Sequence, residues 1–313
     1  MTRGRFYFDV VEATLDEFIL IVDDWDFEET SSGATDEERG EFWDGLLSGY
    51  EHERVEWEPS QHQHGGEAQP PDVETLRSAS TVIWYADEWD TSDPTELADL
   101  FNPFTEGYNT LAGYMRVGGN LFLCGYRPLE QITRMPYPMT VADTDTTEGA
   151  RFVRDVLHIG SADASGKRAN KDSPWAYGYC FYGDVPTDVG ESYGFEPMYI
   201  DSVGPGGYPE PGKWYAYTWT YPNFTRCGFP DVERLETYQG SGLEIFTIDS
   251  FLNMNYEGVS STVLYLSGDD RGNTCYFGHP LFFSQTDQVA PNFDRIMALF
   301  GEQKTTVAGQ GQD

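Results

Sequence analysis

Two stretches, Ser80-Thr-Val-Ile-Trp-Tyr-Ala86 and Val117-Gly-Gly-Asn-Leu-Phe-Leu-Cys-Gly125, decide the fold class. Each is a short apolar run that ends where polar or glycine residues begin, and the residues between them have helical spacing. Neighbouring strands of a parallel sheet that are joined by a crossover helix have this pattern. The sequence therefore predicts an open α/β sheet, in which ligands and active sites collect at the carboxyl ends of the strands.

Other apolar and amphipathic segments extend this pattern along the chain. Strands are expected at 17–23, 54–58, 81–86 and 120–124, and the βα pattern returns at 261–266 and 273–278. Helices are expected at 35–50, 93–116, 147–157 and 288–300, the first of them with a capping box formed by Thr35 and Glu38. These elements predict a mainly parallel sheet with helices on both of its faces.

The βα alternation fades between about residues 160 and 258, where glycine, proline and aromatic residues dominate. The alternating segment 213–221 favours β structure, so this region is expected to be an aromatic-rich β/loop insertion packed on the sheet. We expect residues 1–14 to be an N-terminal strand or the tail of a preceding module. Residues 15–301 would then form the α/β domain, and 302–313 a polar tail.

The composition is strongly acidic, with 53 acidic and 19 basic residues and a formal net charge of −34. Such a charge repels nucleic acid and anionic membranes, so neither is expected as a partner. The only lysines are Lys167, Lys171, Lys213 and Lys304. Low lysine content with high acid content fits the cytoplasm of a halophile or a halotolerant setting, and it fits a secreted acidic protein equally well.

The sequence has no apolar run of about 18 residues, so no membrane insertion is expected. The start of the chain, Met1-Thr-Arg-Gly-Arg5, lacks the apolar core of a signal peptide. Two alternatives stay open: the chain is cytosolic, or it is exported by a signal that lay upstream and was removed.

Four cysteines are widely spaced, and none belongs to a zinc-type cluster. Cys180 and Cys227 flank one aromatic-rich stretch and could be bridged, although all three complete pairings of Cys124, Cys180, Cys227 and Cys275 stay open.

The order of the motifs resembles a known family. The motifs are Val22-Asp-Asp24, Val82-Ile-Trp-Tyr85, Gly118-Gly-Asn-Leu-Phe-Leu-Cys-Gly125, Phe152-Val-Arg-Asp-Val-Leu-His158 and Gly278-His-Pro-Leu-Phe-Phe283. Over roughly residues 15–160 and 240–301 the chain resembles the class I glutamine-amidotransferase-like domain of large secreted bacterial multidomain proteins. The resemblance implies a flavodoxin-like three-layer sandwich, and it implies membership of a group in which many domains have no known activity.

Cys124 and His279 are the candidate catalytic residues. Cys124 stands where a strand–turn–helix elbow would expose a nucleophile, but Phe122-Leu-Cys-Gly-Tyr126 lacks both glycines of the Gly-x-Cys-x-Gly pattern of true amidotransferases. His279 precedes Pro280, but Leu281 replaces the glutamate that orients the imidazole in those enzymes. Asp269 or Asp270 could substitute for it, and Cys124 could equally be a structural cysteine.

Acidic residues follow the predicted first and third strands, where ligands would gather. Asp23, Asp24 and Asp26 could bind Ca²⁺ through carboxylate oxygens, or they could form a solvated acidic rim. The candidate ligand-binding residues are Asp23, Asp24, Trp84, Glu88, Gly125 and Tyr126. His62 and His64 lack a third metal ligand nearby and are expected in an exposed loop.

Three functions are compatible with these features. The departures at the elbow favour a non-catalytic amidotransferase-like domain of an exported or cell-surface protein, which serves ligand binding, adhesion or assembly with other domains. The alternative is a Cys–His hydrolase or amidotransferase-like enzyme. A third possibility is a carbohydrate-binding module whose aromatic residues, between 175 and 221, stack on glycans, although aromatic side chains also dominate ordinary core burial.

Overall fold

A computed structural model describes the greater part of the chain, and all structural statements below concern these residues. They are 13–15, 18–25, 36–56, 71, 73–87, 97, 100–101, 109–164, 181–200, 219–221, 224–226, 232–250, 257–268 and 272–305.

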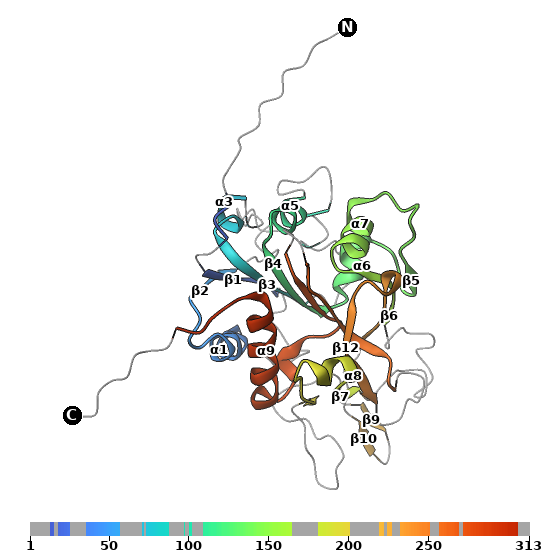
Figure 1. The fold of residues 1–313 in the computed structure, drawn as a ribbon. Helices are drawn as coiled ribbons and strands as arrows, with labels where there is room; N and C mark the ends of the chain where they lie inside the picture. Colours follow the sequence, from blue (N-terminus) through green and yellow to red (C-terminus); the bar gives the residue numbers. More distant parts are fainter. Residues whose placement is uncertain are drawn as a thin grey trace, which may run out of the picture.

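The main sheet has nine strands in the order β2-β1-β3-β4-β14-β13-β12-β7-β8 (Figure 1). The first five are mutually parallel: β2 (His52–Glu56), β1 (Phe18–Trp25), β3 (Ala79–Asp87), β4 (Asn120–Tyr126) and β14 (Thr274–Phe277). The remaining four continue the sheet in antiparallel fashion: β13 (Ser260–Tyr265), β12 (Leu243–Ser250), β7 (Phe181–Pro186) and β8 (Met198–Tyr199). The predicted α/β class is confirmed, with a sheet that is parallel in one half and antiparallel in the other.

Helices contribute to the core on both faces of the parallel half. The buried cluster on one face includes residues of α1 (Asp36–Leu46) and α9 (Thr286–Phe300). The cluster on the other face includes residues of α3 (Val73–Leu76), α5 (Thr110–Arg116), α6 (Pro128–Thr133) and α7 (Glu148–Asp155). Figure 1 shows these two groups of helices on opposite sides of the sheet.

Strand residues alternate between the two clusters, as the period of two in a strand requires. Ile19 and Ile21 of β1 belong to one cluster, and Leu20 and Val22 belong to the other. Burial on both faces explains why these strands read as continuous apolar runs in the sequence.

The register places the predicted site residues near one edge of the sheet. Asp23 lies opposite Tyr85, Tyr85 lies opposite Cys124, and Cys124 lies opposite Phe277. This row crosses β1, β3, β4 and β14 close to their carboxyl ends, so Asp23 and Cys124 share the edge that the sequence predicts.

The insertion differs from the expectation that it packs on the sheet. Its strands β7, β8 and β12 lengthen the sheet instead. The insertion also contains α8 (Asp188–Ser192) and the short helix η1 (Tyr238–Gly240), and a second short helix, η2 (Leu281–Phe283), follows β14. A separate antiparallel sheet consists of β5 (Met139–Thr140), β6 (Ile159–Ala164) and β11 (Glu233–Thr237), and β9 (Trp219–Tyr221) pairs with β10 (Phe224–Arg226).

The expectation that the strand at 261–266 continues the βα pattern is wrong. β13 is antiparallel to both β12 and β14. The connections 251–259 and 266–273 are too short for the crossover of a dozen or more residues that a parallel pair needs.

The polar tail begins with anchored residues. The hydroxyl of Thr81 donates to Glu302 at 2.6 Å, and the amide of Thr305 donates to the carbonyl of Gly49 at 2.7 Å. The predicted strand near the N-terminus and the tail after residue 305 lie outside the described residues. No helix in the described ranges has both the length and the apolar composition needed to cross a membrane.

A substitution at Gly125 tests whether β3 and β4 approach each other closely at this position. A Cβ atom at this position would lie 2.0 Å from the carbonyl oxygen of Ala86. We expect Gly125→Ala to lower the free energy of unfolding by about 1–3 kcal/mol, measured by urea denaturation, because the strands must separate to admit the methyl group.

Gly45→Ala is the matched control. Gly45 is exposed in α1, and a Cβ atom there would meet nothing within 4 Å. We expect this variant to gain about 0.5–1 kcal/mol from helix propensity. Equal stability of the two variants would contradict the proposed steric role of Gly125.

Candidate functional site

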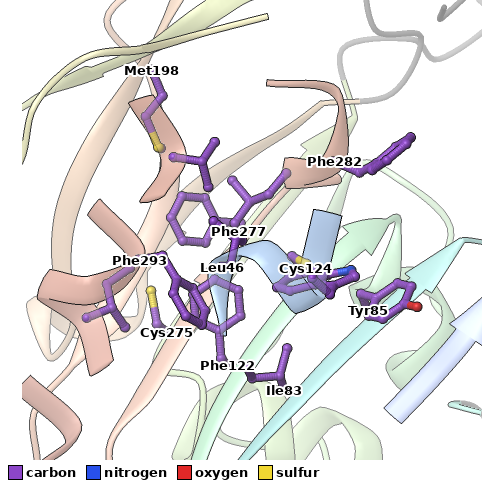
Figure 2. Close-up of a cluster of buried hydrophobic side chains, with 14 of the residues drawn as sticks. Leu46, Ile83, Tyr85, Phe122, Cys124, Met198, Cys275, Phe277, Phe282 and Phe293 are labelled. Atoms are coloured by element: carbon purple, nitrogen blue, oxygen red, sulfur yellow. The ribbon is translucent and has the colours of Figure 1, made fainter. Parts of the chain in front are cut away.

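Cys124 lies inside the hydrophobic core. Its side chain is 1% exposed, and Figure 2 shows it among Tyr85, Phe122, Phe277 and other members of a buried cluster. Burial raises the pKa of the thiol to about 12, against a smaller opposing effect of a backbone hydrogen bond at Leu281. Because the thiolate is the nucleophilic form of cysteine, a raised pKa of this thiol opposes a nucleophilic role.

His279 is also fully buried, two residues after the end of β14. Its Nε2 atom lies 2.6 Å from Oδ2 of Asp184, and its Nδ1 atom lies 3.4 Å from the carbonyl oxygen of Pro280. The ring packs against Phe181 and Phe277, with centroid separations of 4.6 and 5.9 Å. Both ring nitrogens therefore face oxygen atoms.

Asp184 supplies the carboxylate that orients the imidazole of His279. It comes from β7, in the antiparallel half of the sheet, and it also accepts a hydrogen bond from the hydroxyl of Ser261 in β13. All three side chains are completely buried. We call Asp184, Ser261 and His279 the histidine clamp; it joins the antiparallel half of the sheet to the segment that follows β14.

Asp23 and Asp24 lie within the last residues of β1, and neighbouring side chains contact them. Asp24 is 2% exposed, and its Oδ2 atom accepts a hydrogen bond of 2.8 Å from the indole of Trp84. Burial and the nearby carboxylate of Asp23 raise the pKa of Tyr85 well above its usual value, and the charges of Arg39 and Arg54 oppose this shift. Asp24 and Trp84 thus stabilise each other below the surface, and the carboxylate of Asp23 lies close to Tyr85.

The other predicted ligand residues are placed only in part. Gly125 lies in β4 against the backbone of Ala86, and the side chain of Tyr126 lies outside what the structure describes. Glu88, Asp26 and the alternative acids Asp269 and Asp270 also lie outside it. Within the described ranges, no three His, Cys, Asp or Glu side chains are grouped so as to hold a metal ion.

A second buried polar cluster surrounds Glu233, which the sequence did not single out. Its carboxyl group accepts hydrogen bonds from the hydroxyls of Tyr137 and Tyr276, and its backbone amide donates to Gly278 at 2.9 Å. Burial raises the pKa of Glu233 to about 8, against the lowering effects of the two tyrosines and of Arg127. The cluster fastens β11 of the small sheet to β14 of the main sheet.

The residues of both clusters carry little signal in the sequence. Asp184 is 95 positions from His279, and Glu233 is 96 positions from Tyr137. An isolated acid inside an apolar strand, as in the segment Phe181-Tyr-Gly-Asp-Val185, is the one feature that could have drawn attention to Asp184.

Several other predicted features lie outside the described residues. They are the two histidines at 62 and 64, the Cys180–Cys227 bridge and most of the aromatic stretch between 175 and 221. Cys124 and Cys275 are both described, and both are free and buried.

Removal of the Asp184 carboxylate should strongly destabilise the fold. We expect Asp184→Ala to lower the free energy of unfolding by about 3–5 kcal/mol, because His279 and Ser261 are then left buried without their partner. Chemical denaturation measures the change. Asp44→Ala is the control, since Asp44 is 62% exposed and its pair with Arg54 should contribute about 1 kcal/mol or less. Similar losses in both variants would refute the role of the clamp.

Glu233 should make stability depend on pH. Its folded-state pKa of about 8 lies above the ordinary value of 4.5, so between these values the folded chain holds a proton that the unfolded chain has lost. The free energy of unfolding should therefore fall from pH 5 to 8, with a contribution from this group of up to about 1.4 kcal/mol per pH unit.

Glu233→Gln should remove this part of the pH dependence, as measured by urea denaturation at intervals from pH 5 to 8. Glu236→Gln, at an exposed position of the same strand, should retain it. If the two variants follow the same pH profile, Glu233 is not the titrating group.

Comparison with known proteins identifies no family for this chain. No family model matches it, and no curated protein matches it. Among solved structures, the chain is similar to a cold-adapted beta-galactosidase from Rahnella sp. R3, with a TM-score of 0.42 and 11% sequence identity. The similarity covers 92% of this chain and 32% of that one, so the chain spans about a third of the length of that protein. A likeness at this score and identity carries no argument about function.

Proposed function

We propose that this chain is a non-catalytic amidotransferase-like domain of an exported or cell-surface protein, which serves ligand binding, adhesion or assembly. The observation that carries the proposal is the burial of both candidate catalytic side chains, Cys124 at 1% and His279 at 0% exposure. A nucleophile and its base must reach the substrate, and the burial of both side chains argues against such roles.

The strand order supports the flavodoxin-like part of the proposal. The five parallel strands follow the order β2-β1-β3-β4-β14, which corresponds to the 2-1-3-4-5 order of flavodoxin-like sheets. Helices contribute to the core on both faces of these strands, as a three-layer sandwich requires. The antiparallel half is then an elaboration added beyond the last parallel strand.

The alternative function, a Cys–His hydrolase or amidotransferase-like enzyme, has one specific observation in its favour. Asp184 lies 2.6 Å from His279 and provides the orienting carboxylate that the sequence motif lacks. The enzyme would still require Cys124 to become accessible and ionised, and the raised pKa of its thiol opposes this.

The proposed cellular setting rests on the charge and the resemblance. A net charge of −34 favours solubility in an exported or surface protein whose other domains are the proposed partners. The cytoplasm of a halophile is the alternative setting. Calcium bound by Asp23, Asp24 and Asp26, and glycans bound by the aromatic insertion, remain proposals of the sequence alone.

Peptide-resolved labelling with iodoacetamide at neutral pH tests the non-catalytic proposal. We expect Cys124 to stay unmodified in the native chain and to react fully in denaturant. A thiol with a pKa near 12 has a thiolate fraction on the order of 10⁻⁵ at pH 7, and burial blocks access to it as well. The variant Ser48→Cys, at an exposed position after α1, provides the reference rate for an accessible thiol.

Labelling of native Cys124 at or above the rate of Ser48→Cys would favour the enzyme. That outcome would predict a further loss of reactivity in His279→Gln, because a true dyad depends on the imidazole.

A further inference from the structure

A cavity of about 250 Å³ opens at the opposite edge of the sheet from Cys124 and His279. It lies where α5 ends before β4, where the chain enters β14 at Gly272, and where β13 ends at Tyr265. α7 and the residues that follow it close the remaining side. The cavity therefore lies at the amino ends of β4 and β14, separate from the site discussed above.

A backbone contact at Gly272 shapes this cavity. A Cβ atom at Gly272 would lie 1.6 Å from the carbonyl oxygen of Gly119, so a side chain there would displace the loop. The amide of Gly272 donates to the carbonyl of Met115 at 3.3 Å. This contact holds the entry to β14 against the end of α5 and leaves the side chain of Met115 in the cavity wall.

The walls of the cavity are mostly apolar. Ala112, Met115, Phe152 and Val156 contribute aliphatic and aromatic surface. Small-molecule sites have this composition, with a few polar groups that fix the orientation of the ligand. A volume of about 250 Å³ suits a compact molecule rather than a macromolecular segment.

Two stacked rings form another part of the wall. The imidazole of His158 and the ring of Tyr265 have centroids 3.5 Å apart and an interplanar angle of 22°. Nδ1 of His158 lies 2.9 Å from the hydroxyl oxygen of Ser241, which fixes the ring, and His158 has a left-handed backbone with a φ of 58°. A rigid planar surface of this kind favours a planar ligand.

Among the charged side chains that line the cavity, all but one form ion pairs with described residues. Arg151 pairs with Glu148 at 2.9 Å, and Asp155 pairs with Arg154 at 2.7 Å. Arg116, in the last turn of α5, lines the cavity and forms no ion pair within the described parts of the chain. An exposed guanidinium beside an apolar cavity is a ready partner for a carboxylate.

We propose that this cavity binds a small aromatic carboxylate, with its carboxylate on Arg116 and its ring against the apolar wall. The proposal names a ligand class for the ligand-binding role given above and rests on that role. Thiol labelling reports on Cys124 at the other edge of the sheet, so the failure of one proposal can be distinguished from the failure of the other.

Sodium benzoate is the probe, and the methyl resonance of Met115 in chain labelled with ¹³C-methyl methionine is the reporter. We expect a saturable shift of this resonance with benzoate and a clearly weaker response to benzamide, which has the same ring without the charge. Arg116→Gln should weaken benzoate binding roughly tenfold, because a charge-assisted hydrogen bond is lost. It should leave the response to benzamide unchanged.

Arg295→Gln is the matched control, since Arg295 is exposed in α9 and the substitution changes the net charge equally. We expect it to bind benzoate as the parent chain does. The other methionine resonances report whether each variant is folded. If Arg116→Gln does not fold, Arg116→Lys, which keeps the charge, provides a second test. Arg116→Lys should bind within a few-fold of the parent chain.

Three results would overturn the proposal. They are a Met115 resonance that benzoate does not shift saturably, equal binding of benzoate and benzamide, and equal weakening in Arg116→Gln and Arg295→Gln.

Discussion

The contact between Asp184 and His279 is the constraint on which the observed arrangement depends. One carboxylate accepts hydrogen bonds from the imidazole after β14 and from the hydroxyl of Ser261 in β13, and all three side chains are excluded from water. A buried charged group of this kind is tolerated only with its partners in place. The contact therefore ties the antiparallel half of the sheet to the segment that follows the last parallel strand.

Burial of polar and reactive side chains differs between the two edges of the parallel strands. At the carboxyl edge, Cys124 lies in the core, and the indole of Trp84 holds Asp24 below the surface. At the amino edge, α5, α7 and the entry to β14 leave a cavity, and Arg116 on its wall forms no ion pair within the described parts of the chain. Ligands of open α/β sheets usually bind at carboxyl ends. Among the described residues, Cys124 and Asp24 at that edge are buried, and the cavity described above lies at the other end.

The polar groups in the interior act chiefly as connections between segments that are distant in the sequence. Glu233 receives hydrogen bonds from Tyr137 and Tyr276 and thereby joins the small sheet to the main one. Its raised pKa follows from the same burial, because removal from water penalises the charged form more than the two hydroxyls compensate. The burial of Glu233 thus explains both the connection between the two sheets and the expected pH dependence of stability.

The sequence by itself determined the α/β class, the core strands around Val82 and Leu121 and the sharing of one edge by Asp23 and Cys124. These follow from local periodicity and from the parallel direction that crossover helices impose. Only the tertiary structure decided the antiparallel course of β13, the partner of His279 and the burial of Cys124. Each of these depends on contacts between segments far apart in the chain, such as Asp184 with His279, and local sequence patterns carry no record of which distant segment will supply the partner.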